Sequence, residues 1–434
     1  MTSSANDHRP QRPRQAGAHP APPAPRVRRP GRASLHALPP LAVALSALAL
    51  ISCVGAAGRP GAAGQSGGRS PAAPTTDASG SAGSPSAVTS PAALPNLTPA
   101  QKAGQRVIYS YSGLQPPATL LSWIRHGQVG GVIFFGGNIS SPAQIAGVIK
   151  QLDQANASAA NPLRAVPLLL MTDQEGGVVR RLPGRPFASE KQIGEAAHPA
   201  AAAAAAGTGA GQNLAGVGMN MNLAPVLDVY RTAGDFDDQF GRSYSTSPQV
   251  VSALGADFIK AQQATGVAAT AKHFPGLGAA SSTQDTDARP VTLNVGLHAL
   301  RTIDEYPYRA AIAAGVKLVM LSWAVYPALA RSTPAGLSSA VVNGELRDRL
   351  GFRGVTITDA LEAGALQAFG TTGHRATLAA RAGMDLILCS GQKASQGRLA
   401  RIALATALSR GALSGSVFDA ALTRVIALRT GLRG

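Results

Sequence analysis

Two cationic side chains and two carboxylates lie close together in the stretch Thr270–Asp287, which reads TAKHFPGLGAASSTQDTD. Lys272 and His273 end a short apolar run typical of a buried strand, and the proline and glycines that follow predict a loop. That loop ends in Asp285 and Asp287, one residue apart. Such a pattern could form a ligand clamp with a mobile catalytic arm. A solvated turn with incidental charges would show the same sequence pattern. The two interpretations differ in whether other predicted strands also end in polar groups.

Similar polar groups follow other apolar runs of the chain. Asp173 follows one such run in the segment DQEGG, Arg181 comes shortly after it, and Asp359 directly follows another run. Further groups of this kind are Glu175, Arg180, Asp228 and Arg242. A single aspartate after a strand is more often a helix cap. Several acids and cations at the same strand ends favour a site for a polyhydroxylated ligand such as a sugar.

The apolar runs alternate with segments of helical period. Strands that are apolar throughout and separated by helices predict parallel strands buried on both faces. Eight such units in one chain predict an α/β fold, a (β/α)8 TIM barrel, whose sites lie at the carboxyl ends of the strands. A doubly wound open sheet is the alternative, but no G-x-G-x-x-G loop follows the first strand. The predicted strands are Arg106–Ser110, Gly131–Phe135, Pro167–Thr172, Met219–Ala224, Ala268–Phe274, Lys317–Ser322, Gly354–Thr358 and Asp385–Ser390.

Composition excludes some functions. The 434 residues carry a formal charge of +17, but aromatic residues make up only 4% and no basic-aromatic alternation appears, so nucleic acid is not an expected partner. Much of the positive charge lies in an arginine-rich N-terminus, and the remainder suits an anionic surface such as a membrane or cell wall. H-x-x-x-H and C-x-x-C patterns are absent from the candidate motifs, so neither a metal nor another cofactor is expected.

The N-terminal segment has the layout of an export signal. A basic stretch precedes the apolar run Leu41–Val54, which is too short to span a bilayer comfortably. Its end, Leu50–Cys53, resembles a bacterial lipobox, so Cys53 is the expected lipidation site and the membrane surface an expected partner. An uncleaved anchor is the alternative. We therefore divide the chain into a signal segment (1–53), a flexible linker rich in Gly, Ala, Ser and Pro (54–95) and one catalytic domain (96–434).

The motifs at the strand ends together resemble glycoside hydrolase family 3. In chain order they are DQEGG followed by arginine, NLAPVLDV, GRSY, KHFPG and ITDAL. The likeness covers Thr98 to Gly434 and is greatest to the single-barrel β-N-acetylhexosaminidases of bacterial cell-wall recycling. Members with β-glucosidase activity usually add a second α/β domain, for which no room remains after Ser390. The resemblance therefore implies a hydrolase built on one TIM barrel.

The resemblance also implies roles for individual residues. Asp359 is similar to the family nucleophile, which attacks the anomeric carbon in a retaining mechanism and forms a glycosyl-enzyme intermediate. Five other residues match those that bind the terminal sugar: Asp173, Arg181, Arg242, Lys272 and His273.

One departure from the family pattern concerns the acid. In this branch the loop after KHFPG usually reads GHG and closes with an Asp-Ser-His segment, whose histidine is the general acid/base. Here Leu277 replaces the first histidine, and Asp285-Thr286-Asp287 stands where the second is expected. A carboxyl group is a poor acid at neutral pH unless its surroundings raise its pKa. We predict that Asp287 or Asp285 supplies the acid, and that each raises the pKa of the other.

Three functions remain open from the sequence. The first is a retaining exo-β-N-acetylglucosaminidase that acts on cell-wall saccharides outside the cytoplasm, as a monomer. The second is a β-glucosidase or β-xylosidase of the same family. The third is a catalytically impaired, lipid-anchored sugar-binding protein. Trp323 stands where related chains often carry a histidine, so the side of the site that binds the leaving group is undefined.

Overall fold

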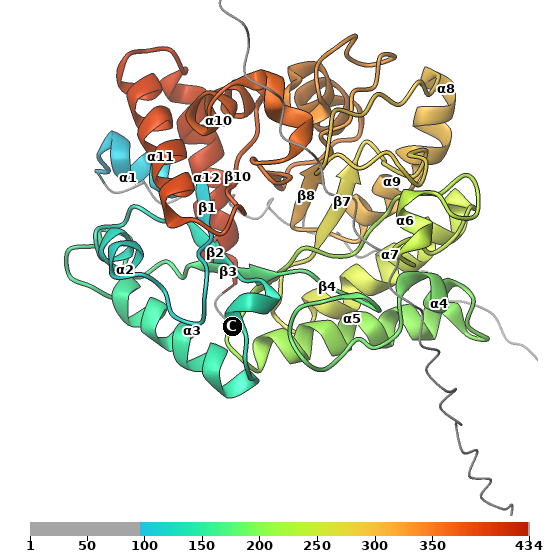
Figure 1. Cartoon of the computed structure of the whole chain (residues 1–434), viewed down its shortest axis with the longest axis horizontal. Helices are drawn as coiled ribbons and strands as arrows, with labels where there is room; N and C mark the ends of the chain where they lie inside the picture. Colours follow the sequence, from blue (N-terminus) through green and yellow to red (C-terminus); the bar gives the residue numbers. More distant parts are fainter. Residues whose placement is uncertain (1–95, 433–434) are drawn as a thin grey trace, which may run out of the picture. The chain divides into compact units, whose positions relative to one another are not determined.

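The computed structural model describes residues 96–432, which fold as a ring of parallel strands surrounded by helices (Figure 1). The expectations for the signal segment, for Cys53 and for the linker fall outside the described residues. Within residues 96–432, no helix is both long and apolar enough to cross a membrane.

Each of the eight predicted strands is present, shorter than its predicted run by one or more residues at its ends. The strands of the ring are β1 (Val107–Tyr109), β2 (Gly131–Ile133), β3 (Leu169–Thr172), β6 (Met221–Asn222), β7 (Thr270–Phe274), β8 (Leu318–Leu321), β9 (Val355–Thr358) and β10 (Ile387–Leu388). Sequence analysis missed an antiparallel hairpin of β4 (Gln174–Gly176) and β5 (Val179–Arg180), which follows β3.

The strands form a closed ring. Five of them pair in the order β10-β1-β2-β3-β6, and three in the order β7-β8-β9, all parallel. Two isolated parallel bridges, Met221 to Ala268 and Val226 to Lys272, connect the β6 region to the β7 region. A third, from Ile357 in β9 to Leu386 just before β10, closes the ring. The predicted (β/α)8 architecture is thus confirmed, with apolar side chains packed inside the ring and a shell of helices outside it.

The strands of the ring alternate with helices, and α4 and α6 are short helices in the segments that follow β5 and β6. The first helix of the described chain begins with a capping box, in which Thr98 accepts a hydrogen bond from the Gln101 amide and Gln101 accepts one from the Thr98 amide. The α-helices are α1 (Pro99–Gly104), α2 (Ala118–Arg125), α3 (Pro142–Asn156), α4 (Glu190–Gly194), α5 (Pro199–Ala215), α6 (Phe236–Gln239), α7 (Pro248–Gln263), α8 (Leu297–Ala299), α9 (Tyr306–Ala313), α10 (Thr372–Ala382), α11 (Ala394–Ser409) and α12 (Gly415–Gly431).

Two segments with the period of a helix differ from a regular α-helix. Residues 297–314 contain α8, a π-helical turn η2 (Leu300–Asp304) and α9. Residues 338–350 contain the π-helix η4 (Ala340–Arg349). Short 3-10 turns complete the described chain: η1 (Gly136–Asn138), η3 (Ala335–Leu337) and η5 (Gly364–Phe369).

The core has two parts. Side chains from the strands, among them Ile133, Met171, Met320 and Leu388, fill the inside of the ring. A larger cluster packs the outer faces of the strands against the helices and includes the buried free thiol of Cys389.

A buried carboxylate stabilises the amino-terminal side of the ring. Asp385, just before β10, is fully buried and pairs with Arg347 and Arg424, each at 2.7 Å. It also accepts a hydrogen bond of 2.9 Å from the Thr356 amide at β9. One side chain thus joins β9, β10, η4 and α12.

We predict that Asp385→Asn lowers the free energy of unfolding by about 3–5 kcal/mol, because it leaves two arginines without their buried partner. Urea denaturation of the purified protein measures this change. Lys102→Ala is the matched control, since it removes the partly exposed pair of Lys102 with Asp419 and should cost no more than about 1 kcal/mol. Equal denaturation midpoints for the two variants would contradict the assignment.

Candidate active site

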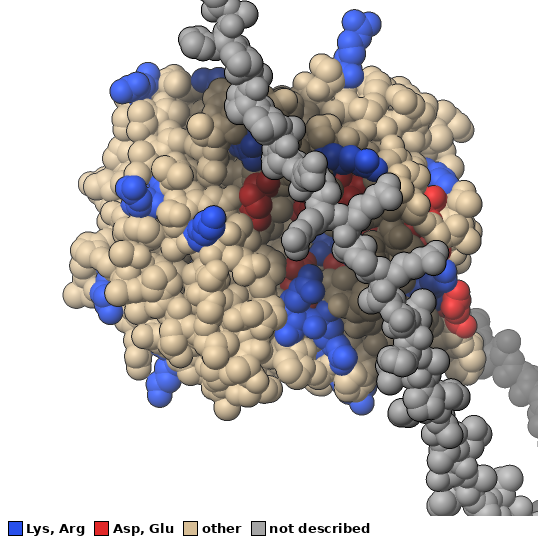
Figure 2. All heavy atoms as spheres, in the orientation of Figure 1, with Lys and Arg blue, Asp and Glu red and all other residues tan. Residues whose placement is uncertain are grey.

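A cavity of about 470 Å³ opens at the carboxyl ends of the strands. Figure 2 shows acidic side chains within a hollow of this face and basic side chains at its edge. All eight residues predicted from the sequence as catalytic or substrate-binding line this cavity: Asp173, Arg181, Arg242, Lys272, His273, Asp285, Asp287 and Asp359. The structure therefore brings together groups from five separate stretches of the chain.

Lys272 is the most deeply placed cation of the cavity. Its side chain extends from β7, and its ammonium group pairs with Asp173 at 2.9 Å and with Glu175 at 2.7 Å. Lys272 and Glu175 are both buried. Burial alone would lower the pKa of Lys272, but the two carboxylates more than offset this, so its pKa is raised and it stays charged.

Glu175 also accepts two hydrogen bonds from one edge of the Arg242 guanidinium group. Arg242 donates to its two oxygens at 2.8 and 2.9 Å, and a third bond of 3.2 Å runs from Arg242 to Asp237. Burial opposes the ionisation of Glu175, but Arg242 and Lys272 together hold its pKa below the usual range. Three of the donor directions of Arg242 are thus used within the protein, which makes this side chain a support for Glu175 at the cavity wall.

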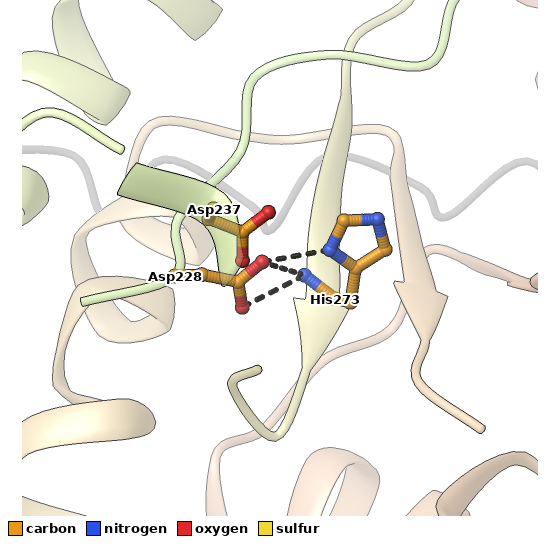
Figure 3. Close-up of side chains that lie close together, drawn as sticks. All are labelled: Asp228, Asp237 and His273. Atoms are coloured by element: carbon orange, nitrogen blue, oxygen red, sulfur yellow. Dashed lines mark hydrogen bonds and ion pairs between the residues drawn. The ribbon is translucent and has the colours of Figure 1, made fainter. Parts of the chain in front are cut away.

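His273 forms a second buried pair with Asp228. Its Nδ1 lies 2.7 Å from the Asp228 carboxylate, which also accepts a hydrogen bond from the His273 amide (Figure 3). The same carboxylate accepts a further hydrogen bond from the Leu277 amide. Burial lowers the pKa of His273, but the charge of Asp228 outweighs it and raises that pKa overall. The Asp228 carboxylate therefore fixes the orientation of the imidazole ring that faces the cavity.

Asp237 lies beside this pair, and its ligand atoms, with those of Asp228 and His273, lie within 4.8 Å of one another. Burial, followed by the charge of Asp228, raises the pKa of Asp237 to about 7. A cation bound by all three residues would have to replace the His273–Asp228 hydrogen bond. The arrangement is that of a hydrogen-bonded Asp–His pair with a third carboxyl group beside it, whose pKa is raised to about 7.

Asp359 lies directly after β9, and its carboxylate accepts a hydrogen bond of 2.7 Å from the Ala360 amide. The carbonyl group of Ala360 in turn accepts a hydrogen bond of 2.8 Å from the indole N–H of Trp323. Trp323 is fully buried and does not line the cavity. It therefore fixes the backbone that follows Asp359, rather than taking the place of a histidine on the leaving-group side.

The loop with the two aspartates is tied to the segment that follows Asp359. The carbonyl of Asp287 accepts a hydrogen bond of 2.7 Å from Gly364, and that of Thr286 accepts one of 3.0 Å from Ala365. A Cβ atom at Gly364 would come within 2.2 Å of the Ala288 carbonyl oxygen, so only glycine permits this approach. These contacts hold the loop next to the candidate nucleophile.

Asp287 has the pKa expected of a general acid. Its side chain is exposed at the cavity, and the negative charge of Asp359 is the largest cause that raises its pKa to about 7. Partial burial and the charge of Asp285 add to the shift. Asp285 has a structural contact as well, since its carboxylate accepts a hydrogen bond of 2.8 Å from the Asp287 amide. The geometry thus favours Asp287 over Asp285 as the proton donor.

Sequence analysis assigned no role to four acidic residues of this region. Glu175 and Asp228 were noted only as polar groups at strand ends. Asp237 gave no signal, because its contact with Arg242 is visible only in the folded structure. Glu362 lines the cavity and accepts hydrogen bonds from Ser390 at 2.7 Å and Gln396 at 2.9 Å.

A closed (β/α)8 ring with paired acids and cations at one rim defines a barrel enzyme with a polar ligand site. The sequence model of the "Glycosyl hydrolase family 3 N terminal domain" matches residues 100–428, so the chain belongs to glycoside hydrolase family 3. An uncharacterized secreted glycosyl hydrolase of Arthroderma benhamiae is 45% identical over 80% of this chain and 97% of its own length. A β-hexosaminidase of Stenotrophomonas maltophilia is 34% identical over 71% of this chain and 92% of its own length.

A solved structure gives the same family. The family 3 β-N-acetylglucosaminidase from Paenibacillus sp. is 36% identical, with a TM-score of 0.73 over 78% of this chain. The match spans 64% of that longer chain, a little under two thirds. The chain is a glycoside hydrolase, as its motifs predict.

We predict that Asp359→Asn lowers the pKa of Asp287 from about 7 towards the ordinary value of about 4, because it removes the charge that opposes ionisation. The titration is measured by NMR on protein with carboxyl-labelled aspartate, and the Asp287 signal is assigned with Asp287→Asn. Asp153, whose pKa is raised by burial alone, is the internal control and should titrate unchanged. An Asp287 signal that titrates equally in both proteins would contradict the coupling.

Proposed function

We propose that this protein is a retaining exo-β-N-acetylglucosaminidase that removes terminal N-acetylhexosamine from cell-wall saccharides. The observation that carries the proposal is the cavity itself, in which Asp359, Asp287 and the buried Lys272 cluster face one space. A retaining glycosidase requires a carboxylate nucleophile and a second carboxyl group that can donate a proton, and the pKa of Asp287 is raised to about 7. The relatives named as β-hexosaminidase and β-N-acetylglucosaminidase support the choice of an acetamido sugar.

The terminal sugar binds at the closed end of the cavity. Asp173 accepts hydrogen bonds from sugar hydroxyl groups, while Lys272, His273 and Arg181 donate to others. Asp173 and Lys272 already pair at 2.9 Å, so both are held in place before the substrate arrives. Arg242 acts from behind this layer, through Glu175.

The reaction uses the two carboxyl groups in turn. The Asp359 carboxylate attacks the anomeric carbon while Asp287 donates its proton to the glycosidic oxygen, so the leaving group departs as an alcohol and a glycosyl ester forms. The Asp287 carboxylate then takes a proton from a water molecule, which attacks the same carbon. This step breaks the ester, restores Asp359 and regenerates the protonated acid.

The location of the protein follows from the N-terminal pattern. The proposed site of action is the outer face of the cell membrane, with the chain exported and anchored through Cys53, and acting as a monomer. The Arthroderma relative is described as secreted, which supports export but not the lipid anchor.

A panel of aryl β-glycosides tests the proposal. We expect the N-acetylglucosaminide to be hydrolysed much faster than the glucoside and xyloside, and Asp359→Asn to abolish the activity. Mass spectrometry after reaction with a mechanism-based fluorosugar should show the label on the peptide that contains Asp359. Preferential cleavage of the glucoside or xyloside would favour the other sugar specificity. A protein that binds N-acetylglucosamine but neither hydrolyses nor becomes labelled would be the sugar-binding alternative.

A second test separates the two loop aspartates. Asp287→Asn should lower kcat by about 10²–10⁴ on a substrate with a poor leaving group and much less on an activated aryl glycoside, because only the former needs protonation. Since the acid must start protonated, kcat/KM of the native enzyme should fall as the pH rises through about 7.

Asp287→Asn should lose this alkaline limb of the pH profile, whereas Asp285→Asn should keep it at a slightly lower pH. If both variants retain full activity on the poor leaving group, neither aspartate is the acid. If only Asp285→Asn is impaired in this way, the two roles are exchanged.

A further inference from the structure

A second cavity of the domain lies at the opposite end of the strands from the candidate active site. It has a volume of about 460 Å³ and is lined by residues 312 and 315–317 before β8, 351–355 at the start of β9, and 424, 427 and 428 of α12. Lys317 directly precedes β8 and Arg353 lies just before β9, whereas Asp359 of the active site directly follows β9. This second cavity, called here the rim cavity, therefore opens at the amino-terminal rim of the ring.

The lining of the rim cavity combines cations with an apolar surface. Lys317 and Arg353 are both exposed, and within residues 96–432 neither pairs with a carboxylate. No acidic residue of the described chain lines the cavity. Most of the remaining lining is apolar and includes Ile312, Val316, Phe352 and Leu428. A ligand that matches both parts carries an anionic group joined to an apolar one.

The third cation of the lining, Arg424, belongs to a cluster with excess positive charge. Arg424 and Arg347 share the single carboxylate of Asp385, each at 2.7 Å. Burial lowers the pKa of Arg347, and among the surrounding charges Asp385 raises that pKa whereas Arg424 and Arg353 lower it. One carboxylate thus faces three arginines, and Lys317 adds a further positive charge at the cavity. An anion bound here meets a positive potential that the protein does not neutralise.

The backbone that carries the two exposed cations is fixed. The Lys317 amide donates to the Gln263 side chain at 3.0 Å, and the Lys317 carbonyl accepts a hydrogen bond of 3.1 Å from the Val355 amide. A Cβ atom at Gly354 would lie 2.7 Å from the Lys317 carbonyl oxygen, so only glycine permits this approach. Lys317 and Arg353 therefore extend from two strand starts that are held side by side before a ligand arrives.

The described chain begins at the same rim. The helix α1 precedes β1, and Gln101 of this helix donates at 3.1 Å to the His126 carbonyl, which lies before β2. Lys102 of the same helix pairs with Asp419 of α12 at 2.8 Å. Residue 96, to which the preceding segment is joined, lies just before α1. In the proposed location that segment leads to a membrane, so the rim that carries the cavity is also the rim at which the chain is attached.

We propose that the rim cavity binds an anionic phospholipid, with the phosphate on Lys317 and Arg353 and the glycerol and first acyl carbons against the apolar lining. A free phosphate uses only the cations, whereas a phospholipid also removes the apolar lining from water. The membrane then lies against the amino-terminal rim, and the active site at the other rim faces away from it. This inference rests on the proposed location at a membrane and not on the proposed hydrolysis.

Vesicle binding tests the site. The protein is the full-length Cys53→Ser chain, which cannot be lipidated, and the vesicles contain phosphatidylglycerol and phosphatidylcholine in equal parts or phosphatidylcholine alone. We expect stronger binding to the anionic vesicles, and a loss of about 10- to 30-fold in that affinity for Lys317→Gln/Arg353→Gln, because two basic residues leave an anionic surface. Every variant keeps the arginine-rich N-terminus, so differences between variants report the domain.

Arg331→Gln/Lys393→Gln is the matched control, because it removes the same charge from the opposite rim. Both residues are exposed and follow β8 and β10, and neither pairs with a carboxylate within residues 96–432. This variant should bind the anionic vesicles as the parent does. Equal losses in the two double variants would indicate a response to net charge alone and overturn the proposal, as would an undiminished affinity in Lys317→Gln/Arg353→Gln.

Soluble ligands distinguish a phospholipid site from a phosphate site. Calorimetric titration compares dihexanoylphosphatidylglycerol, dihexanoylphosphatidylcholine and inorganic phosphate, each below the concentration at which the lipids form micelles. We expect the anionic lipid to bind most tightly, and Lys317→Gln/Arg353→Gln to remove its advantage over the zwitterionic lipid. Equal affinity for inorganic phosphate and the anionic lipid would contradict the lipid assignment.

A fluorescent label locates the contact with the membrane. In the Cys53→Ser chain, an environment-sensitive fluorophore is placed on Ala427→Cys, at an exposed position of the cavity lining, or on Ser395→Cys, an exposed position of α11 outside it. Cys389 is buried and should not react. Anionic vesicles should shift the emission at position 427 to shorter wavelength and leave that at position 395 unchanged. The reverse pattern would place the membrane on another face and overturn the proposal.

Hydrolysis of an aryl glycoside in solution separates this inference from the proposed function. Lys317→Gln/Arg353→Gln should retain the native rate, because both residues lie outside the active-site cavity. If vesicle binding depends on these two residues while no glycoside is cleaved, the lipid site stands and the hydrolytic function fails. If glycosides are cleaved but binding is indifferent to the two residues, the lipid site fails alone.

Discussion

The site depends on a chain of buried charges that alternate in sign. Lys272 from β7 pairs with Glu175 of the hairpin, Glu175 with Arg242, and Arg242 with Asp237 of α6. A buried charge is tolerated only with a partner, so each member requires the next one to be in place. The network therefore fixes the hairpin and the segment around α6 against β7, although none of these three is joined to another by continuous sheet.

This chain of charges divides the cavity into two electrostatic regions. On the side of β3 and β7, Lys272 and Arg242 pair with the acids and hold the pKa of Glu175 below its usual range, which suits hydrogen bonding to hydroxyl groups. On the side of β9, Asp359, Asp285 and Asp287 face one another without an equal number of cations, and Asp287 is therefore hard to ionise. The same fold thus provides a binding region and an acid–base region within one cavity, because the counter-ions are distributed unevenly between them.

The sequence was sufficient for the ring and for much of the site, for a physical reason. Strands buried on both faces must be apolar throughout, so β1 to β3 and β6 to β10 are visible as runs, and the polar residue that follows each run must lie at the same rim. The hairpin was missed because β4 and β5 are too short for any alternation to appear. Asp237 and Trp323 could not be assigned either, because their roles depend on contacts that form only in the folded chain. Asp237 accepts a hydrogen bond from Arg242, and Trp323 donates one to Ala360. Hydrophobic periodicity in the sequence therefore predicts strands and helices, whereas contacts between side chains of different elements are visible only in the structure.

The replacement of a loop histidine by aspartate has a consequence for the proposed two-step reaction. An imidazole has a suitable pKa by its own chemistry, but Asp287 reaches about 7 chiefly because Asp359 is charged. When Asp359 becomes an ester, its negative charge disappears and the main obstacle to ionisation of Asp287 disappears with it. The residue that gave up its proton as an acid is then stabilised as a carboxylate, at the step where a base must activate water. In this site the state of the nucleophile therefore sets the protonation of its partner, and a carboxyl group can serve both half-reactions without a histidine.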